Sequence, residues 1–179
     1  MATIDLHYVD ELIQARQSQH GGSPGAPPVL GGHRVGTSIN RSCIVMLSAL
    51  LQSYVEEVFQ DAARRVFPQF AAHQDGFDAY WRQVKGWGNP SDSNIKTLFL
   101  RLGVVDVFSG LSWQHTDERA IKKNLDTLNQ LRNQIAHGAS RIVVNQASYS
   151  LSLAEVTRFR NFSHTFANRF ERHVAGFIP

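Results

Sequence analysis

Apolar positions recur along this chain at steps of three and four residues, which is the period of an amphipathic α-helix. The strongest such pattern covers residues 38–67. Its apolar positions are Leu47, Leu51, Tyr54, Val58 and Ala62, widened by Ile44, Val45, Leu50 and Val55. A helix that is apolar on several sides is normally buried among other elements. We therefore predict that residues 38–67 form a central helix, which Pro68 ends.

Weaker patterns predict further helices around this one. They cover residues 3–19, 77–85, a stretch from the Asn89-Pro90-Ser91 turn to about Leu102, 117–137 and 152–174. Glycine and proline crowd residues 20–37, which predicts a flexible loop. The weak alternation in RIVVNQASYSLSL predicts a short β-hairpin before the last helix. The expected fold is a single all-α domain over residues 1–179, with about five or six helices and this small hairpin.

Composition limits the classes of protein that the chain can represent. With 179 residues, 42% hydrophobic and 18% charged, it is globular rather than disordered. The net charge of +3 permits a nucleic-acid partner without demanding one. The single cysteine, Cys43, excludes an intramolecular disulfide and lies in an apolar run, so we expect a buried structural thiol.

Targeting signals and membrane spans are not expected. The longest apolar run, around Cys43–Leu51, is shorter than the roughly 20 residues that cross a bilayer. The N-terminal stretch MATIDLHYVDELIQ has early acidic residues and no apolar core, unlike a signal peptide. The sequence therefore predicts a cytoplasmic protein with no membrane partner.

The stretch LRNQIAHG, residues 131–138, ends the predicted helix 117–137 with unexpected polar residues. The apolar stripe of that helix consists of Ile121, Leu125, Leu128, Leu131 and Ile135. On a helical wheel Arg132 points into this stripe, where a buried arginine without a partner is costly. Two interpretations stay open. Arg132 meets a carboxylate, another polar group or a second subunit, or it extends from the edge of the stripe into water.

The same helix end carries Asn133 and His137, which are four residues apart and share a face. We expect Asn133 to orient the His137 ring, and Gly138 to adopt the left-handed conformation that closes helices. Arg132 and His137 lie roughly 140° apart on an ideal helix, so one straight helix does not bring both to one atom. Either the helix loosens at residues 136–138, or two copies pack around a twofold axis.

An arginine and a histidine without acidic or cysteine clusters suit one kind of chemistry. The sequence has no group of residues with metal-ligand spacing, so we expect neither a metal nor a cofactor. Arg132 can neutralise charge on a phosphate, and His137 can transfer a proton to or from an attacking or leaving oxygen. With RNA, the internal 2′-hydroxyl supplies the nucleophile, so the protein needs none of its own.

These residues resemble a known family. LRNQIAHG is similar to the R-x4-6-H signature of HEPN domains, with Arg132 and His137 as the signature pair and Asn133 after the arginine. The stretches SCIVMLSALLQSYVEEVF and GNPSDSNIKTLFLRLGV also resemble the RiboL-PSP-HEPN and MAE_28990-type branches. The resemblance covers most of residues 38–175.

The resemblance implies a helical bundle that forms a homodimer through its motif helices. It also implies a metal-independent endoribonuclease that leaves a 2′,3′-cyclic phosphate. Such proteins often belong to toxin–antitoxin, anti-phage or RNA-processing systems, so an antitoxin protein becomes a second expected partner besides RNA. The alternative is a non-catalytic module that dimerises and binds RNA or protein.

One departure from the family pattern concerns the partner of the motif arginine. Relatives often carry an acidic residue on the long buried helix. This chain has Gln52 where the acid is expected, with Glu56 and Glu57 nearby. The identity of the group that meets Arg132 therefore stays open.

The last predicted helix carries other candidate residues. RFRNFSH places Arg158 and His164 at R-x5-H spacing, but in mid-helix among phenylalanines and without a glycine stop, so we interpret this second match as coincidence. Arg158, Arg169 and Arg172 cluster on one face of this helix. Most such faces are merely solvated, yet arginines can bind phosphates, and these three are our candidate RNA-binding residues.

Overall fold

The structure, a computed structural model, describes residues 2–19, 28–30 and 33–178. In these ranges six helices have nine residues or more, and α3 is a single turn. The helices are α1 (His7–Gln19), α2 (Thr37–Val66), α3 (Gln69–Ala72), α4 (Gln74–Val84), α5 (Asp92–Leu100), α6 (Glu118–Ala136) and α7 (Leu153–Val174). The strands are β1 (Val29–Leu30), β2 (His33–Arg34), β3 (Val143–Val144) and β4 (Ala147–Ser148). The prediction of an all-α bundle with a hairpin before the last helix is confirmed.

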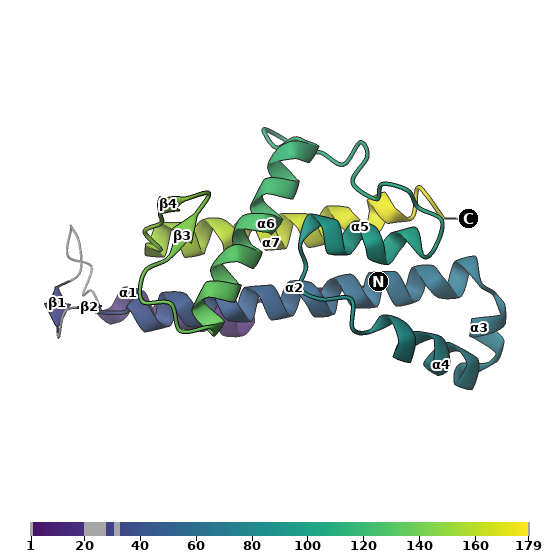
Figure 1. Ribbon diagram of the computed structural model, residues 1–179, viewed down its shortest axis with the longest axis horizontal. Helices are drawn as coiled ribbons and strands as arrows, with labels where there is room; N and C mark the ends of the chain where they lie inside the picture. Colours follow the sequence, from purple (N-terminus) through teal and green to yellow (C-terminus); the bar gives the residue numbers. More distant parts are fainter. Residues whose placement is uncertain (1, 20–27, 31–32, 179) are drawn as a thin grey trace.

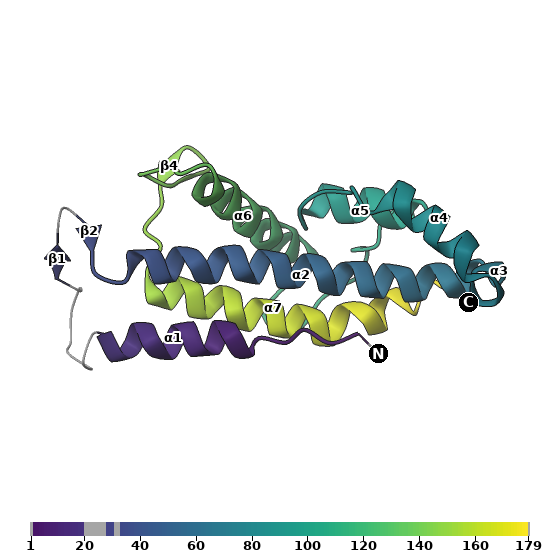
Figure 2. The same ribbon diagram turned by 90° about the horizontal axis from the view of Figure 1, so that it is seen from below.

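The helices form three layers, which Figures 1 and 2 show from two sides. α2 and α7 lie side by side in the middle and run in the same direction. α1 covers one face of this pair, and α4, α5 and α6 lie on the other face. α6 crosses α2 and α7 steeply, and its C-terminal end lies over the first half of α2. The last turns of α6 therefore lie on the face opposite α1.

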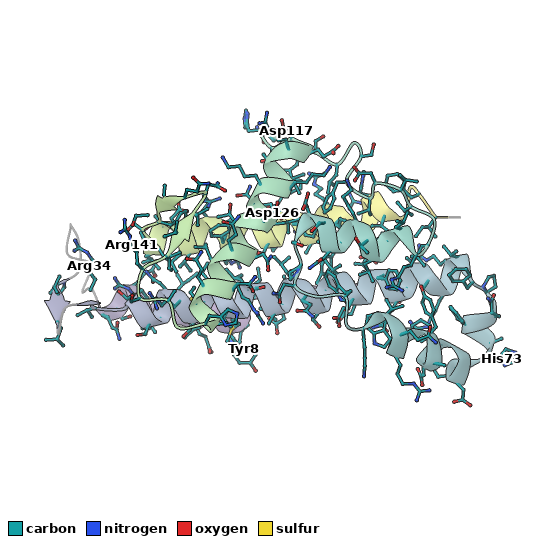
Figure 3. The ribbon with its side chains drawn as sticks, viewed as in Figure 1. Tyr8, Arg34, His73, Asp117, Asp126 and Arg141 are labelled. Carbon is teal, nitrogen blue, oxygen red and sulfur yellow. The ribbon has the colours of Figure 1, made fainter. Side chains whose placement is uncertain are left out.

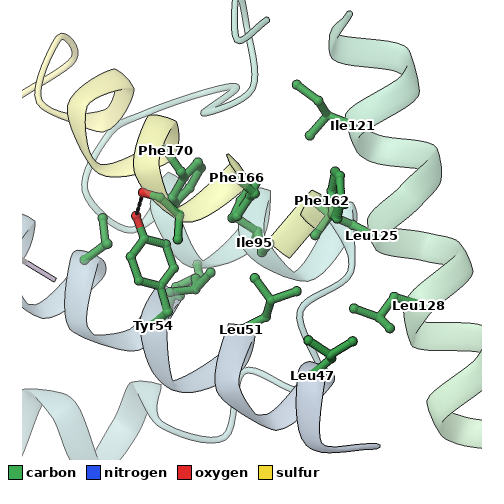
Figure 4. Close-up of a cluster of buried hydrophobic side chains, with 14 of the residues drawn as sticks. Leu47, Leu51, Tyr54, Ile95, Ile121, Leu125, Leu128, Phe162, Phe166 and Phe170 are labelled. Carbon is green, nitrogen blue, oxygen red and sulfur yellow. Dashed lines mark hydrogen bonds between the residues drawn. The ribbon is translucent and has the colours of Figure 1, made fainter. Parts of the chain in front are cut away.

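The core lies where α2 meets α5, α6 and α7 (Figure 4). Aliphatic side chains of α2, α5 and α6 meet a row of phenylalanines on α7. The fully or nearly fully buried members are Leu47, Leu51, Ile95, Ile121, Leu125, Leu128, Phe159, Phe166 and Phe170. Each such side chain contributes roughly 1.5–3 kcal/mol by its removal from water. The apolar periodicity of the sequence therefore corresponds to a real shared core.

Tyr54 joins α2 to α7 by a polar contact inside this core. Its hydroxyl donates to the carbonyl of Ala167 at 2.6 Å and accepts from the Glu171 N–H at 3.2 Å. Both bonds satisfy a phenol that is only 1% exposed. Near the start of α2, the amide of Asn40 donates to the carbonyl of Leu151 at 2.9 Å. These contacts set the register of the two parallel helices.

Helix boundaries agree with the sequence prediction to within a few residues, and the differences have local causes. α1 begins at His7 rather than at residue 3, and the Asp5 carboxylate accepts from the otherwise unpaired His7 N–H there at 2.9 Å. Asp117 and Ser152 cap α6 and α7 at the predicted starts of these helices. The short helix α3 was not predicted, and it forms directly after Pro68.

The loop predicted for residues 20–37 lies partly outside the described residues. Its described part holds one unexpected element, the antiparallel pair of β1 and β2, in which Val29 faces Arg34 and Leu30 faces His33. The predicted hairpin before α7 is confirmed as β3 and β4. Its two-residue turn has positive φ at both Asn145 and Gln146, as a type I′ turn requires.

One helix of the described residues is long and apolar enough to cross a membrane by length and composition alone. This helix is α2, and half of its most apolar window is buried inside the bundle. It is enclosed by α1, α5, α6 and α7, which accounts for its apolar composition without a membrane. Evidence for a membrane span is therefore weak.

The thiol of Cys43 is structural, as predicted. The side chain is 1% exposed on α2. Burial raises the pKa of this thiol to about 11. A thiol with this pKa carries almost no thiolate at neutral pH and is a poor nucleophile.

Candidate functional site

The N-terminal end of α6 is anchored to the rest of the bundle by charges. The Asp117 carboxylate accepts from the Ala120 N–H at 2.7 Å and caps the helix. Lys122 bridges Glu118 at 2.5 Å and Asp106 at 3.3 Å, and Lys96 of α5 reaches Asp106 at 3.0 Å. Figure 3 shows Asp117 at the N-terminal end of this helix. The network fixes the orientation of α6 and hence of the motif at its other end.

The C-terminal end of α6 closes with a Schellman motif. Gly138 has φ of 73°, its N–H donates to the Ile135 carbonyl at 3.0 Å, and the Ala139 N–H reaches Gln134 at 2.9 Å. The prediction of a left-handed Gly138 is confirmed. His137 is the exposed C-cap residue, and its N–H still donates to the Asn133 carbonyl at 3.0 Å. The helix therefore does not unwind between Arg132 and His137.

Two side chains fix the segment after His137. Gln134 forms a pair of hydrogen bonds with the backbone of Val143, at 2.6 Å and 2.9 Å, and so pins the β3–β4 hairpin to α6. Arg41 of α2 donates to the carbonyl of Ser140 at 3.0 Å. The turn beside His137 is thus held from two helices.

Arg132 lies half-buried on α6, next to three asparagine side chains, Asn133, Asn89 and Asn94, which we call the amide row. Its Nη1 donates to Oδ1 of Asn133 at 3.2 Å, and the same oxygen accepts from Nδ2 of Asn89 at 2.9 Å. The side-chain amide of Asn94, on α5, donates a hydrogen bond to the backbone carbonyl of Asn89 at 2.9 Å. Across the described ranges, no carboxylate forms an ion pair with Arg132. Its charge is therefore met by a neutral amide alone.

The acidic residues of α2 do not fill the place of the missing partner. Glu56 accepts from the indole N–H of Trp87 at 3.0 Å and from the Gln52 amide at 3.3 Å. Glu57 is exposed. Neither carboxylate forms an ion pair with Arg132 among the described residues, which leaves the guanidinium available to a negatively charged ligand.

The structure places the three predicted site residues differently from the expected pairing. Asn133 contacts Arg132 and Asn89, and it forms no hydrogen bond with the His137 ring in the described part of the chain. Asn89 is a site residue that sequence reasoning missed. Its only signal was the GNP turn, which lies 44 residues before Asn133.

A scan against family models matches RiboL-PSP-HEPN over residues 7–176. The chain belongs to the RiboL-PSP-HEPN family. The match spans nearly the whole sequence and includes α6 with its motif. No curated protein and no solved structure matches the chain in the corresponding comparisons.

Membership of this HEPN family indicates that the protein is a nuclease or an RNA-binding module. Among the described residues, no group of three or more histidine, cysteine, aspartate or glutamate side chains is arranged to hold a metal ion. The polar groups that this HEPN chain offers at the end of α6 are Arg132, Asn133 and the exposed His137.

The three candidate RNA-binding arginines of this HEPN chain have different surroundings. Every nitrogen of the Arg158 guanidinium is engaged, by Glu155, Asn124 and the Tyr149 hydroxyl. Arg158 also lies over the Phe159 ring at 4.1 Å. These contacts make Arg158 a structural residue of α7.

Arg169 and Arg172 are exposed further along α7 and stay candidates for contacting RNA. The structure also separates the second R-x5-H match of the HEPN chain. Arg158 is tied to Glu155, whereas His164 faces a different surface and contacts Asn168. This arrangement supports the interpretation of that match as coincidence.

A carboxyl pair joins α6 to α5 in the HEPN bundle. Oδ1 of Asp126 accepts from the Asp92 N–H at 3.3 Å, at the N-terminus of α5, and Figure 3 shows Asp126 on the side of α6 that faces α5. Burial raises the pKa of Asp126; the backbone bond opposes this rise, and the nearby Asp92 carboxyl adds to it. For Asp106, burial would raise the pKa, but hydrogen bonds from Lys96, the Phe108 backbone and Lys122 outweigh it and lower that pKa.

These opposite pKa shifts predict opposite effects of removing each charge. A carboxyl with a raised pKa contributes full stability below its ordinary value of 3.8 and loses it as pH rises through the folded value. A carboxyl with a lowered pKa contributes above that value and loses it as pH falls. At pH 7 we expect Asp126→Asn to raise Tm by about 2 °C, and Asp106→Asn to lower it by about as much.

Thermal unfolding followed by circular dichroism at pH 7 and pH 4 checks this pair of variants. The gain in Asp126→Asn should shrink as pH falls from 7 to 4, because the raised pKa lets wild-type Asp126 take up its proton at a higher pH than an ordinary aspartate does. The loss in Asp106→Asn should shrink less over the same range, because its lowered pKa keeps Asp106 charged to a lower pH. Equal changes of one sign in both variants would contradict the assignment.

Proposed function

We propose that this HEPN protein is a metal-independent endoribonuclease that cleaves RNA by attack of the 2′-hydroxyl and leaves a 2′,3′-cyclic phosphate. Arg132 stabilises the negative charge that develops on the phosphate oxygens. His137 transfers a proton to or from the attacking or leaving oxygen. Asn133 positions the guanidinium of Arg132 through the amide contact described above.

The observation that carries this proposal is that the half-buried Arg132 has no carboxylate partner among the described residues. Its guanidinium is half-buried and meets only an amide oxygen within the described residues. Arginine keeps its charge at any physiological pH, so such a site favours an anion. A phosphate matches the forked geometry of a guanidinium, and His137 supplies an exposed proton carrier on the same helix end.

The proposed active unit is a homodimer formed through the α6 helices. Because α6 stays helical up to His137, Arg132 and His137 keep an angular separation of roughly 140° around its axis. One copy therefore points them in different directions. A twofold arrangement of α6 helices lets the arginine of one copy act with the histidine of the other.

Our proposal for the cellular setting is supported by the family resemblance and not by the geometry of α6. We propose a cytoplasmic enzyme of a toxin–antitoxin or anti-phage system, with RNA as its substrate and an antitoxin protein as its regulator. Such an enzyme is harmful when free, so a partner that covers the end of α6 would hold it inactive.

The second candidate function is a non-catalytic module that dimerises through α6 and binds RNA or protein. The observation that favours this second function is the hydrogen bonding within the amide row. Asn89 and Arg132 already share the Oδ1 atom of Asn133, as in a purely structural polar cluster. In this case Arg132 and His137 would build the dimer surface only.

The two functions separate in an RNA cleavage assay in EDTA. The enzyme cleaves RNA with the chelator present, and the 3′ ends of the fragments resist ligation until the cyclic phosphate is opened and removed. The module binds RNA or a partner without producing fragments. Cleavage that requires added divalent metal would contradict the proposed mechanism.

Asn89 gives a test of the positioning role of the amide row. Replacing it by alanine removes a neutral donor to Asn133 Oδ1 without touching Arg132 or His137. We expect kcat for RNA cleavage to fall by about tenfold with little change in KM, because the guanidinium is less well held in the transition state. Ser93→Ala, at an exposed position on the same loop–helix junction, is the matched control and should leave kcat unchanged.

A further inference from the structure

A hollow with both apolar and charged lining residues lies on the opposite side of the bundle from α6. It has a volume of about 560 Å³ and is formed by α7, the last turn of α2 and the N-terminal segment. Figure 2 shows that segment running beside the second half of α7, on the face away from α5 and α6. The hollow is therefore separate from the Arg132–His137 site, although its Arg172 is also one of the candidate RNA-binding residues. Binding of a ligand there can be measured without RNA cleavage.

The floor and one wall of this hollow are apolar. Ala167 of α7 and Ala175, the residue after its end, are small enough to leave space along the helix, and Ala2 and Ile4 of the N-terminal segment line one side. Ligand pockets of about 300–1,000 Å³ commonly combine such an apolar surface with a few polar groups. The volume suits a molecule of the size of a mononucleotide.

Two of the polar residues that line the hollow are arginines. Arg65 comes from α2 and Arg172 from α7, and neither forms an ion pair with a carboxylate in the ranges that the structure describes. By contrast, the nearby Arg160 is taken up by Asp10, with two bonds of 2.8 Å and 2.7 Å. The guanidinium groups that line the hollow therefore have no internal counter-ion among the described residues, whereas their neighbour does.

His164 and Glu171 complete the rim. The Asn168 amide nitrogen lies 3.3 Å from Nε2 of His164, which restrains this ring one turn along α7. The Glu171 carboxylate also lines the hollow but has no ion pair with either arginine in the described part of the chain. It disfavours a bare anion by repulsion, and it can accept hydrogen bonds from sugar hydroxyls or a base amine.

We propose that this hollow binds a mononucleotide, with its phosphate on Arg65 and Arg172 and its base against the apolar wall. Arginine forms bidentate, charge-assisted bonds with phosphate, and two arginines from different helices fix its position. His164 donates a third hydrogen bond to the phosphate, and Glu171 accepts from the sugar. A nucleoside without phosphate lacks the main contacts, and inorganic phosphate lacks the apolar ones.

The proposal is tested by isothermal titration calorimetry of the full chain with AMP, GMP, adenosine and inorganic phosphate. We expect at least one nucleotide to bind at least tenfold more tightly than adenosine and inorganic phosphate. Arg65→Ala and Arg172→Ala should each weaken that binding by about tenfold, the effect of losing one charge-assisted contact. Arg119→Ala is the matched control, because this exposed arginine of α6 does not line the hollow and is no candidate for contacting RNA.

Circular dichroism melts of each variant check that the fold is retained. Failure of both nucleotides to bind the wild-type chain would overturn the proposal. So would binding that Arg119→Ala weakens as much as Arg172→Ala does. Because binding is measured without RNA cleavage, a negative result here leaves the proposed nuclease site unaffected, and the reverse also holds.

Discussion

Replacing Arg132 or His137 by alanine is expected to lower the rate of RNA cleavage about a thousandfold while leaving the fold intact. A lost donor to a charged transition state costs about 10²–10³ in rate, and a lost general acid or base about 10²–10⁴. Both side chains lie on the surface or half-buried at the end of α6, outside the apolar core. The measurement is the single-turnover rate in EDTA, with melts of each variant as the check on folding.

Two matched variants show whether this loss is specific to the motif. Arg119→Ala removes an exposed arginine from the opposite end of α6, and His164→Ala removes the histidine of the second R-x5-H match. We expect both to cleave RNA at rates close to the wild type. Arg132→Lys should be intermediate, because lysine keeps the charge but loses the bidentate geometry. Unchanged cleavage in Arg132→Ala or His137→Ala would contradict the assigned roles.

Mixing the two inactive variants is expected to restore activity. In a dimer of one Arg132→Ala chain and one His137→Ala chain, the first supplies an intact histidine and the second an intact arginine. If the acting pair comes from two copies, one of the two sites is whole. An equal mixture with free exchange should regain about a quarter of wild-type activity, since half of its dimers are mixed.

The mixing experiment needs proof that the chains exchange. Native mass spectrometry of chains that carry tags of different mass measures the mixed dimer directly. No regain of activity in a sample shown to contain mixed dimers would mean that one chain supplies both residues. A monomer at micromolar concentration in solution scattering would contradict the shared site altogether.

The helices and their ends were predictable because they depend on local sequence. Periodic apolar residues place the buried faces of α2 and α7, and single residues such as Asp117, Gly138 and Ser152 set helix ends through their own backbone or side-chain bonds. Those features need no knowledge of the rest of the chain. The turn of β3 and β4 belongs to the same class.

The partners of the site residues were not predictable because they come from distant segments. Asn133 was expected to meet His137, four residues away, and instead shares its oxygen between Arg132 and Asn89. That contact exists because α5 packs against α6 and brings the preceding turn with it. Likewise, the wheel groups Arg158 with two other arginines but cannot show that Tyr149 and Asn124 occupy its nitrogens.

The buried Cys43 makes this chain convenient for labelling. With the single native thiol enclosed by α2 and its neighbours, and with its pKa raised to about 11, a maleimide reagent has almost no thiolate to attack in the folded state. A cysteine introduced at an exposed position can therefore be labelled alone, without first removing the native one. The slow rate at which Cys43 itself is modified then measures how often the core opens, and so reports global unfolding under native conditions.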